Sequence, residues 1–323
     1  MRSEKSYVSP HHCVEYFDTG HDQTLAVHQV SSRREGPTLA LLGGVHGDEP
    51  EGVLAILRLF HELDDAQIAG TVRAVPIANP IAFTHGTRST PTDGLNLARV
   101  FPGDAEGSVT ARLAHIISSR VIAGADLLID LHSAGAGLDM PLFCGYRTVN
   151  DAVAATSAGA ARAFGCPLVW AHDVATPGRS LSVADDLNIP SLYVESRGGG
   201  QVRHSELEAY VRGVLRVMTW MGMIDSHKPT PVDQDLICGG HGNVDSGLIA
   251  PMDGLLVTLV SAGDRVSARD PLLHIYGIDG SLQSVLHAPH DGIVMLVRHT
   301  INVSLGETLC LLAPVPTAWS AAA

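Results

Sequence analysis

Two histidines and two glutamates at the ends of apolar runs are the residues of this chain that could most clearly do chemistry. His46 and Glu49 lie three residues apart in the string GGVHGDEPEG, just after an apolar run. His132 closes a second apolar run, and Glu195 closes a third. A catalytic zinc site takes three protein ligands and keeps one position open for water. The spacing therefore predicts one zinc ion per chain, held by His46, Glu49 and His132.

Glu195 fits the role of general base better than that of a further ligand, because the open position must stay free. Zinc would be expected to lower the pKa of its water to about 7 and to polarise a substrate carbonyl. Glu195 could then accept the proton of that water and pass it to a leaving nitrogen. The structural alternative for Glu195 is an ion pair with Arg197 or with another arginine.

The pair of His46 and Glu49 also has a structural alternative. Glu49 and Glu51 could be acids in the first turn of a helix, where the positive end of the helix dipole favours them. Asp48 stands where the N-cap of that helix is expected. The metal site is favoured because ligand-type residues follow several apolar runs, and active sites in open α/β sheets form at the carboxyl ends of strands.

The elements that must position these residues alternate between strands and helices over the first two-thirds of the chain. The expected strands are 38–42, 71–77, 126–131 and 191–195, and the expected helices are 53–63, 111–123, 152–164 and 206–221. A long loop rich in Gly and Thr is expected over 79–107, and a loop of this length is usually functional or disordered. Apolar strands that alternate with helices indicate an α/β/α sandwich with a mixed, largely parallel and buried sheet.

The composition changes near His227, and Lys228–Pro231 is typical of a domain boundary. We expect a catalytic domain over residues 1–230 and a small β-rich domain over residues 231–323. Within the second region, MDGLLV, AGDRV and PLLHI are echoed by HDGIVM, VSLGE and LCLL. This repeat predicts a small barrel or sandwich made of two related halves.

The repeated turns resemble those of the biotinyl/lipoyl carrier domain. A carrier domain needs a lysine for its cofactor, and Lys5 and Lys228 are the only lysines of the chain. Neither lies in the β region, so a carrier function is excluded. The region would instead cover the catalytic domain or join subunits into a homo-oligomer.

Composition narrows the class of protein. The 323 residues are 45% hydrophobic, and a formal net charge of -13 argues against a nucleic-acid partner. No apolar run approaches the roughly 18 residues of a membrane span, and the N-terminus lacks the apolar core of a signal peptide. The five cysteines form no CxxC pair, which predicts reduced, mostly buried thiols in a cytoplasmic protein.

Four strings in order, GGVHGDEPEG, NLARVFPG, DLHSAG and VESRGGG, resemble the succinylglutamate desuccinylase/aspartoacylase family of the zinc carboxypeptidase superfamily. The resemblance spans roughly Leu39 to Met221. It implies the same zinc ligands and Glu195 as the catalytic base. It also implies that Arg88 polarises the scissile carbonyl and that Arg99 grips a substrate carboxylate, for which a guanidinium offers paired donors.

One departure from the family concerns substrate recognition. The family motif Asn-Leu-Asn-Arg is here Asn96-Leu97-Ala98-Arg99. Ala98 has no side-chain amide, so recognition of an α-carboxylate is expected to be weaker or differently built. Asn96 could compensate as a substrate contact, or it could only form a turn. Arg179 lies where relatives have a substrate loop, and it could contact substrate or remain a solvated arginine.

The leading hypothesis is a zinc-dependent amidohydrolase that removes an acyl group from a small N-acyl amino acid or N-acyl amine. The alternatives are a zinc carboxypeptidase that acts on short peptides and a non-catalytic metal-binding relative. No ligand and no base is missing from the motifs, which argues against the non-catalytic relative. A β-rich cover would narrow the cleft and favour small substrates over peptides.

Overall fold

The computed structural model describes residues 3–7, 12–20, 23–63, 68–174, 176–225, 232–240 and 242–318. Their largest element is a sheet whose strands pair side by side in this order: β1 (Ser3–Tyr7), β2 (His12–Gly20), β3 (Gln23–Ser31), β5 (Ala69–Val75), β4 (Arg34–Gly43), β6 (Leu127–Leu131), β10 (Ser191–Glu195), β8 (Phe143–Arg147), β9 (Leu168–His172), β11 (Asp235–Cys238) and β20 (Thr317–Ala318). The expected boundary at Lys228–Pro231 lies outside the described residues.

The centre of the sheet is parallel, as the sequence predicts. Strands β5, β4, β6 and β10 run in one direction, so their carboxyl ends meet at one edge. For the whole sheet the expectation of a largely parallel arrangement is wrong, because only five of the ten pairings between described strands are parallel. Strands β1, β2 and β3 form an antiparallel meander at one edge, and β8 runs antiparallel to β10.

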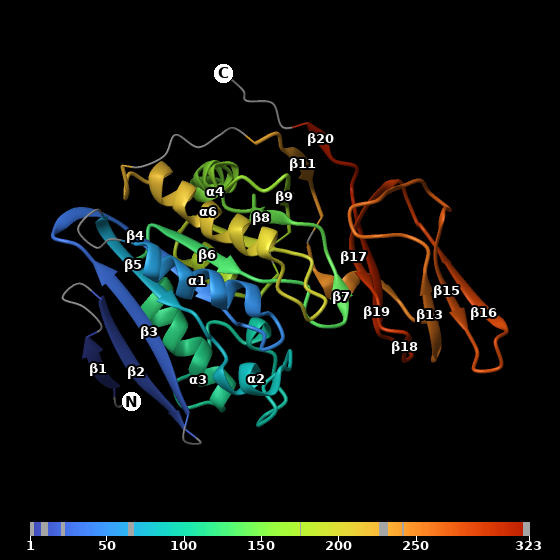
Figure 1. The fold of residues 1–323 in the computed structure, drawn as a ribbon, viewed down its shortest axis with the longest axis horizontal. Helices are drawn as coiled ribbons and strands as arrows, with labels where there is room; N and C mark the ends of the chain where they lie inside the picture. Colours follow the sequence, from blue (N-terminus) through green and yellow to red (C-terminus); the bar gives the residue numbers. More distant parts are fainter. Residues whose placement is uncertain are drawn as a thin grey trace.

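Helices cover both faces of this sheet (Figure 1). On one face pack α1 (Pro50–Glu62), α4 (Asp151–Phe164) and α6 (His204–Trp220). On the other face pack α3 (Val109–Ile116), its π-helical continuation η3 (Ile117–Ile122) and α5 (Ser180–Asp186). Alternate residues of β4 separate the two cores, since Leu39 and Leu41 face the first and Ala40 and Leu42 the second. The mixed α/β fold is thereby confirmed.

The start of α1 differs from the expectation. Glu49, not Asp48, is the N-cap residue, and its side chain caps no backbone N–H. Pro50 takes the first helical position, where its missing N–H would be unpaired anyway. The Asp48 carboxylate instead accepts a hydrogen bond from the backbone N–H of Ala136 at 3.2 Å. Glu49 does not cap because its carboxylate turns towards two histidines.

The segment 79–107, expected as a loop, holds two short helices, α2 (Pro80–His85) and η2 (Leu97–Arg99). Asparagines begin both. The side chain of Asn79 accepts from the backbone N–H of Ala82, and that of Asn96 accepts from Ala98. Helices of six and three residues are too short for an apolar period to show, so capping residues are their main sequence signal.

Beyond residue 231 the chain first returns to the large sheet. Strand β11 pairs parallel with β9, and β20 pairs with β11. The large sheet therefore crosses the boundary expected after residue 230. The reason is that β11 adds a strand beside β9 and buries Ile237 completely there.

The rest of this region forms two antiparallel sheets. One contains β12 (Leu248–Ile249), β19 (Thr308–Ala313), β17 (Gly292–Arg298) and β14 (Arg265–Val266). The other contains β16 (Leu282–His287), β15 (Pro271–Tyr276), β13 (Gly254–Thr258) and β18 (Asn302–Val303). Among the described residues after 231, the 3-10 turn η4 (Val244–Ser246) is the only helical element. The division into two domains stays a prediction.

The β-rich region is joined closely to the rest of the molecule. Strand β7 (Leu138–Asp139), which comes from the first part of the chain, pairs with β17, and Figure 1 shows these sheets at the end opposite β1 to β3. One apolar cluster contains Phe143 and Trp170 from the large sheet together with Leu296 and Leu311 from the β-rich region. Because the two parts share a core, the segment around η4 has a fixed place beside the large sheet.

No helix in the described ranges combines the length and the apolar character that crossing a membrane requires. All five cysteines are free, and three of them, Cys144, Cys166 and Cys310, are buried. The burial of these three agrees with the prediction of mostly buried thiols, and their reduced state stays a prediction.

Candidate active site

The parallel strands bring the predicted residues to one edge of the sheet. His132 follows β6, and its backbone N–H donates to the carbonyl oxygen of Val194 in β10 at 2.9 Å. This bond places His132 beside Glu195, the last residue of β10. In the register of these strands Asp130 lies opposite Tyr193. Because side chains alternate along a strand, Tyr193 and Glu195 share one face of the sheet.

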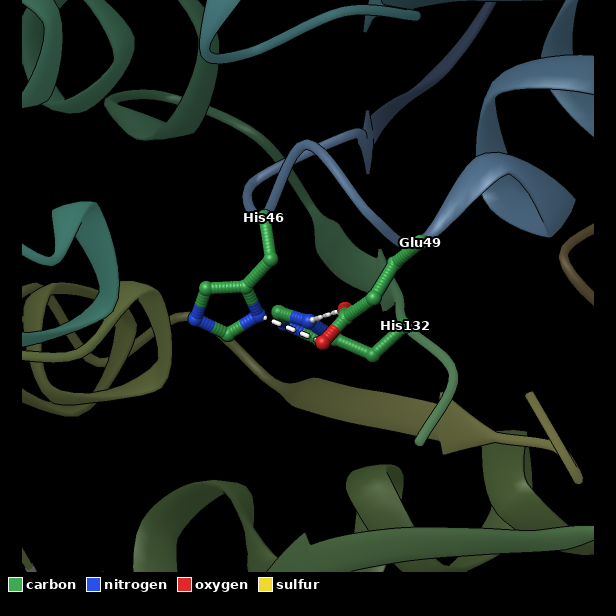
Figure 2. Close-up of side chains that lie close together, drawn as sticks. All are labelled: His46, Glu49 and His132. Atoms are coloured by element: carbon green, nitrogen blue, oxygen red, sulfur yellow. Dashed lines mark hydrogen bonds and ion pairs between the residues drawn. The ribbon is translucent and has the colours of Figure 1, made fainter. Parts of the chain in front are cut away.

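His46, Glu49 and His132 converge around one point, which Figure 2 shows. The Nδ1 atom of His46 lies 2.7 Å from Glu49 Oε1, and the Nδ1 atom of His132 lies 2.8 Å from Glu49 Oε2. One potential ligand atom from each residue lies within 4.8 Å of the others. His46 and Glu49 are buried, and the His132 side chain is 11% exposed. The cluster is thus shielded from bulk water.

The second ring nitrogen of each histidine, Nε2, also has a polar partner, on the side of the ring away from Glu49. His46 Nε2 lies 3.1 Å from the side-chain oxygen of Asn96, and His132 Nε2 lies 3.2 Å from Asp130 Oδ2. These partners hold each ring so that its Nδ1 atom faces Glu49, and a bound cation would take the place of the proton between Nδ1 and the carboxylate. Metal-binding histidines characteristically have such partners, which fix the ring and its tautomer. The donor set therefore fits a divalent ion such as zinc, which binds imidazole nitrogen and carboxylate oxygen.

Charge in the cluster follows from burial and neighbours. Burial alone would raise the pKa of Glu49, but His46 and His132 outweigh it and hold that pKa well below its usual range. Burial lowers the pKa of His46. Burial also opposes protonation of His132, but Asp130 and Glu49 raise its pKa well above the ordinary value. Glu49 is consequently an anion held between two histidine rings, and the protonated His132 supplies part of the positive charge that a bound cation would replace.

Glu195 lies in the same cavity and carries an unpaired oxygen. Its Oε2 atom is buried and has no hydrogen-bond partner in the described chain. Burial, the largest cause, raises the pKa of Glu195 to about 8. The alternative partner Arg197 lies 3.5 Å from Asp139 instead. After β10 the chain turns sharply at Gly198, whose φ of 69° and contact with Gly135 leave no room for a side chain.

A cavity of about 100 Å³ opens beside the cluster. Four arginines line it: Arg88, Arg99, Arg147 and Arg179. Three of the four are paired with carboxylates, Arg88 with Glu49 at 3.0 Å, Arg99 with Asp245 at 2.9 Å and Arg147 with Asp185. Arg179 differs, because its side chain donates to oxygens of neutral groups, Asn243 Oδ1 at 2.8 Å and the carbonyl oxygen of Pro177 at 3.4 Å.

Six of the eight predicted site residues line this cavity. His46, Arg88, Arg99, His132, Arg179 and Glu195 line the cavity. Glu49 lies behind them between the two histidines. Asn96 is outside the lining, because its side-chain oxygen is directed to His46 and to the backbone N–H of Ala98. Ala98 lines the cavity and is 8% exposed, so the missing amide would have faced the ligand space.

Sequence reasoning missed several lining residues. Tyr193 and His172 face the cavity, and the Tyr193 hydroxyl lies 2.6 Å from His172 Nε2. Tyr193 is two residues before Glu195, so strand parity could have found it. Gly242 and Val244 form another part of the wall. Gly242 lies just before η4 and Val244 is its first residue. No sequence motif in that part of the chain marks either of them.

Fold and site together define a class: an α/β/α protein with a buried His-Glu-His cluster at the carboxyl ends of parallel strands. A family model described as the succinylglutamate desuccinylase/aspartoacylase catalytic domain matches residues 35–221. This chain therefore belongs to the succinylglutamate desuccinylase/aspartoacylase family, as the motifs predict.

Individual relatives extend the likeness to most of the chain. An N-alpha-acetyl-L-2,4-diaminobutyric acid deacetylase of Halomonas elongata is 30% identical over 290 residues, which cover 88% of this chain and 84% of that protein. A succinylglutamate desuccinylase/aspartoacylase of Rhodobacter sphaeroides has a solved structure with a TM-score of 0.82 and 26% identity, covering 97% and 95%. A succinylglutamate desuccinylase of Silicibacter has the same fold, with a TM-score of 0.87 and 22% identity, covering 98% and 99%.

Proposed function

We propose that this chain is a zinc-dependent amidohydrolase that removes an acyl group from a small N-acyl amino acid or N-acyl amine. One observation carries the proposal: the unpaired, buried oxygen of Glu195 shares a cavity with the His-Glu-His cluster. A metal site and a nearby carboxylate without a partner are the two parts that metal-assisted hydrolysis needs. The similarity to a deacetylase of an N-acetyl diamino acid favours an acetyl group on a small amino acid.

His46, Glu49 and His132 would hold one zinc ion per chain. When bound there, zinc would lower the pKa of a water molecule to about 7 and polarise the scissile carbonyl. Asn96 and Asp130 keep the two imidazoles turned to the site. We propose that Asn96 acts in this way, as a positioning residue, and not as a direct substrate contact.

Glu195 serves as the general base in this proposal. A base must hold a carboxylate near the attacking water and then give the proton to the leaving nitrogen. Burial raises the pKa of Glu195 to about 8, so its carboxyl group is poised to take and release a proton near neutral pH. A cation bound at the cluster would shift this pKa downward, because it favours the ionised form.

Arg88 is proposed to bind the carbonyl oxygen of the scissile amide. Its Nη1 atom donates to Glu49 Oε1 at 3.0 Å and lines the cavity, which places a positive charge next to the cluster. A fixed donor at that place stabilises the charge that develops on the oxygen during attack.

Arg179 is the arginine best prepared to bind a substrate carboxylate. It lines the cavity without a carboxylate partner among the described residues, and a guanidinium can form two parallel hydrogen bonds with a carboxylate. Burial, followed by the charge of Arg99, lowers its pKa to about 10, which still leaves it charged at neutral pH. The role of Arg99 as a carboxylate contact stays a prediction, because Asp245 occupies its guanidinium.

The size of the cavity favours small substrates. At about 100 Å³ it is smaller than the roughly 300–1,000 Å³ of pockets for drug-sized ligands. Gly242 and Val244 narrow it from the C-terminal side. No observation favours the carboxypeptidase alternative. The cytoplasmic location and assembly into a homo-oligomer remain further parts of the proposal.

A deacylation screen tests the function directly. Zinc-loaded protein would be incubated with N-acetyl, N-succinyl and N-formyl derivatives of amino acids and diamines, and free amine would be measured. We expect hydrolysis of at least one small N-acyl amino acid, and loss of activity after chelation that added zinc restores. Hydrolysis of C-terminal residues from short peptides, with no deacylation, would contradict the proposal.

A further inference from the structure

We infer that Asp245 sets the substrate class of this site: by occupying Arg99, it makes the cavity select amino acids with one carboxylate over those with two. The inference rests on the proposed function, because it concerns the amino-acid part of the substrate. Asp245 lies in η4, outside the residues that the family model matches.

Asp245 occupies the edge of the Arg99 guanidinium that carries the Nε and Nη2 hydrogens. Its Nε and Nη2 atoms donate to Asp245 Oδ2 at 3.1 and 2.9 Å, and Nη1 donates to the carbonyl oxygen of Ala98 at 3.0 Å. Two neighbouring N–H groups on one edge are what a substrate carboxylate would need for paired hydrogen bonds. With Asp245 in place, that edge is not available to the substrate.

Arg179 is consequently the one lining arginine left for an anionic group, as far as the described residues go. Arg88 faces Glu49, and Arg147 is buried and paired with Asp185. A single guanidinium without a carboxylate partner matches a single substrate carboxylate. A second substrate carboxylate would find Arg99 taken and the charge of Asp245 nearby, and like charges repel.

The place of Asp245 is tied to Arg179 through Asn243. The Asn243 side-chain oxygen accepts both from the backbone N–H of Asp245 at 3.2 Å and from Arg179 Nη2 at 2.8 Å. The same short segment therefore contacts both arginines: Asn243 holds Arg179, and Asp245 occupies Arg99. Its neighbours Gly242 and Val244 line the cavity, so η4 is close to the ligand space.

A substrate with a cationic side chain would suit this arrangement. The Asp245 side chain is 59% exposed, and its hydrogen bonds with Arg99 use Oδ2. Its Oδ1 atom could accept a hydrogen bond from an ammonium group of the substrate. This agrees with the similarity to a deacetylase of an N-acetyl diamino acid.

The test compares two substrates that differ in the second charged group. The kcat/KM values of N-acetyl-L-aspartate and N-acetyl-L-2,4-diaminobutyrate would be measured for the zinc-loaded wild type and for Asp245→Asn. The substitution keeps the shape but removes the charge, so the contact with Arg99 should weaken enough for a substrate carboxylate to compete for that guanidinium. We expect the ratio of the two values to move towards the aspartate derivative by about tenfold, the lower end for a hydrogen bond to a charged group.

Two further variants make the test specific. Asp235→Asn removes a charge of similar exposure that lies 3.2 Å from Arg265, and it should leave the ratio unchanged. Arg99→Ala added to Asp245→Asn should abolish the gain, because the gain depends on a freed guanidinium. An unchanged ratio in Asp245→Asn, or a gain that survives without Arg99, would overturn the inference and leave the deacylase function standing.

Binding measurements keep the inference testable if the proposed function fails. The affinities of L-aspartate and L-2,4-diaminobutyrate would be measured by calorimetry for the same variants. Asp245→Asn should strengthen the binding of aspartate relative to diaminobutyrate by a similar factor. If the wild type hydrolyses no N-acyl amino acid, the proposed function is wrong, whereas unchanged relative affinities would contradict the assignment of Asp245 alone.

Discussion

The side-chain oxygen of Asn96 lies 3.1 Å from Nε2 of His46, although the two residues are 50 positions apart in the chain. The same oxygen accepts from the backbone N–H of Ala98 at 2.9 Å and so begins η2. One atom thus joins the first ligand of the cluster to the turn that carries Arg99. If the cluster binds a metal as proposed, this atom would link the position of His46 to that of η2.

Substitution of Asn96 should weaken metal binding. Asn96→Ala removes the acceptor that orients His46, and loss of such a partner typically lowers metal affinity about 10–100-fold. Zinc affinity would be measured by competition with a chromophoric chelator. Asn96→Asp should recover most of the affinity because it restores an acceptor, and Asn150→Ala, which removes a cap of α4, should not change it. Equal zinc affinity in Asn96→Ala and wild type would exclude the positioning role.

Loss of the carboxylate at Glu195 should stop turnover without loss of metal. Glu195→Gln cannot accept a proton, and general-base steps typically contribute about 10²–10⁴-fold. The wild-type rate should also rise with pH as the Glu195 carboxyl group ionises. Burial raises the pKa of Glu195 to about 8, and a bound cation would lower it, so the midpoint of the rise should lie at or below pH 8. Steady-state rates and zinc content measure both effects. Near-normal turnover in a zinc-loaded Glu195→Gln protein would leave Glu195 without a catalytic role.

Arg88→Ala should lower kcat more than it raises KM. The reason is that a donor to the developing oxyanion acts mainly in the transition state, and removal of one such donor reduces kcat by about 10²–10³. Arg58→Ala, which removes a surface arginine of α1, is the control. A change confined to KM would make Arg88 a ground-state contact of the substrate.

His28 should make stability depend on pH. Burial, followed by the charge of His12, lowers its pKa to about 4, whereas the unfolded chain has the ordinary value of 6.5. Between these values the unfolded state binds more protons, so the free energy of unfolding should fall as pH drops from about 6.5 to 4, and this contribution should be constant below. Because the His28 side chain is partly exposed, we expect the free energy of unfolding to change by about 1–2 kcal/mol, which is less than the full pKa shift would give.

Denaturant unfolding at several pH values checks this contribution. His28→Phe cannot titrate and keeps the ring that stacks on Phe60 at a centroid distance of 5.1 Å. That variant should lose the pH-dependent part, while His61→Gln, an exposed change on α1, should keep it. Parallel pH curves for wild type and His28→Phe would show that His28 does not titrate in this range.

Features of the structure that depend on neighbouring residues could be predicted from the sequence, whereas features that depend on contacts between distant segments could not. The strand ends of β4, β6 and β10 are marked by continuous apolar runs, so the convergence of His46, His132 and Glu195 could be predicted before the fold was known. Asp48 was expected as the helix cap, but its carboxylate is drawn to Ala136, far away in sequence. Local patterns cannot show such a competing partner.

The parts of the cavity that come from other segments were the hardest to predict. Asp245 and Asn243 reach Arg99 and Arg179 only because β17 pairs with β7 and β11 joins the large sheet. The repeat in the β-rich region indicated its strands but gave no contact with the site. Which guanidinium is occupied and which is free depends on this packing, so substrate selection could not be deduced from motifs alone.

The zinc content of purified protein tests the central claim most directly. Wild-type chain and His132→Ala would be saturated with zinc, desalted and analysed by elemental mass spectrometry, with the exposed His290→Ala as control. We predict about one zinc per chain for wild type and His290→Ala, and a large loss for His132→Ala, because the cluster then keeps only His46 and Glu49 of the three ligands that such a site needs. Undiminished zinc in His132→Ala would contradict the assignment of the metal site.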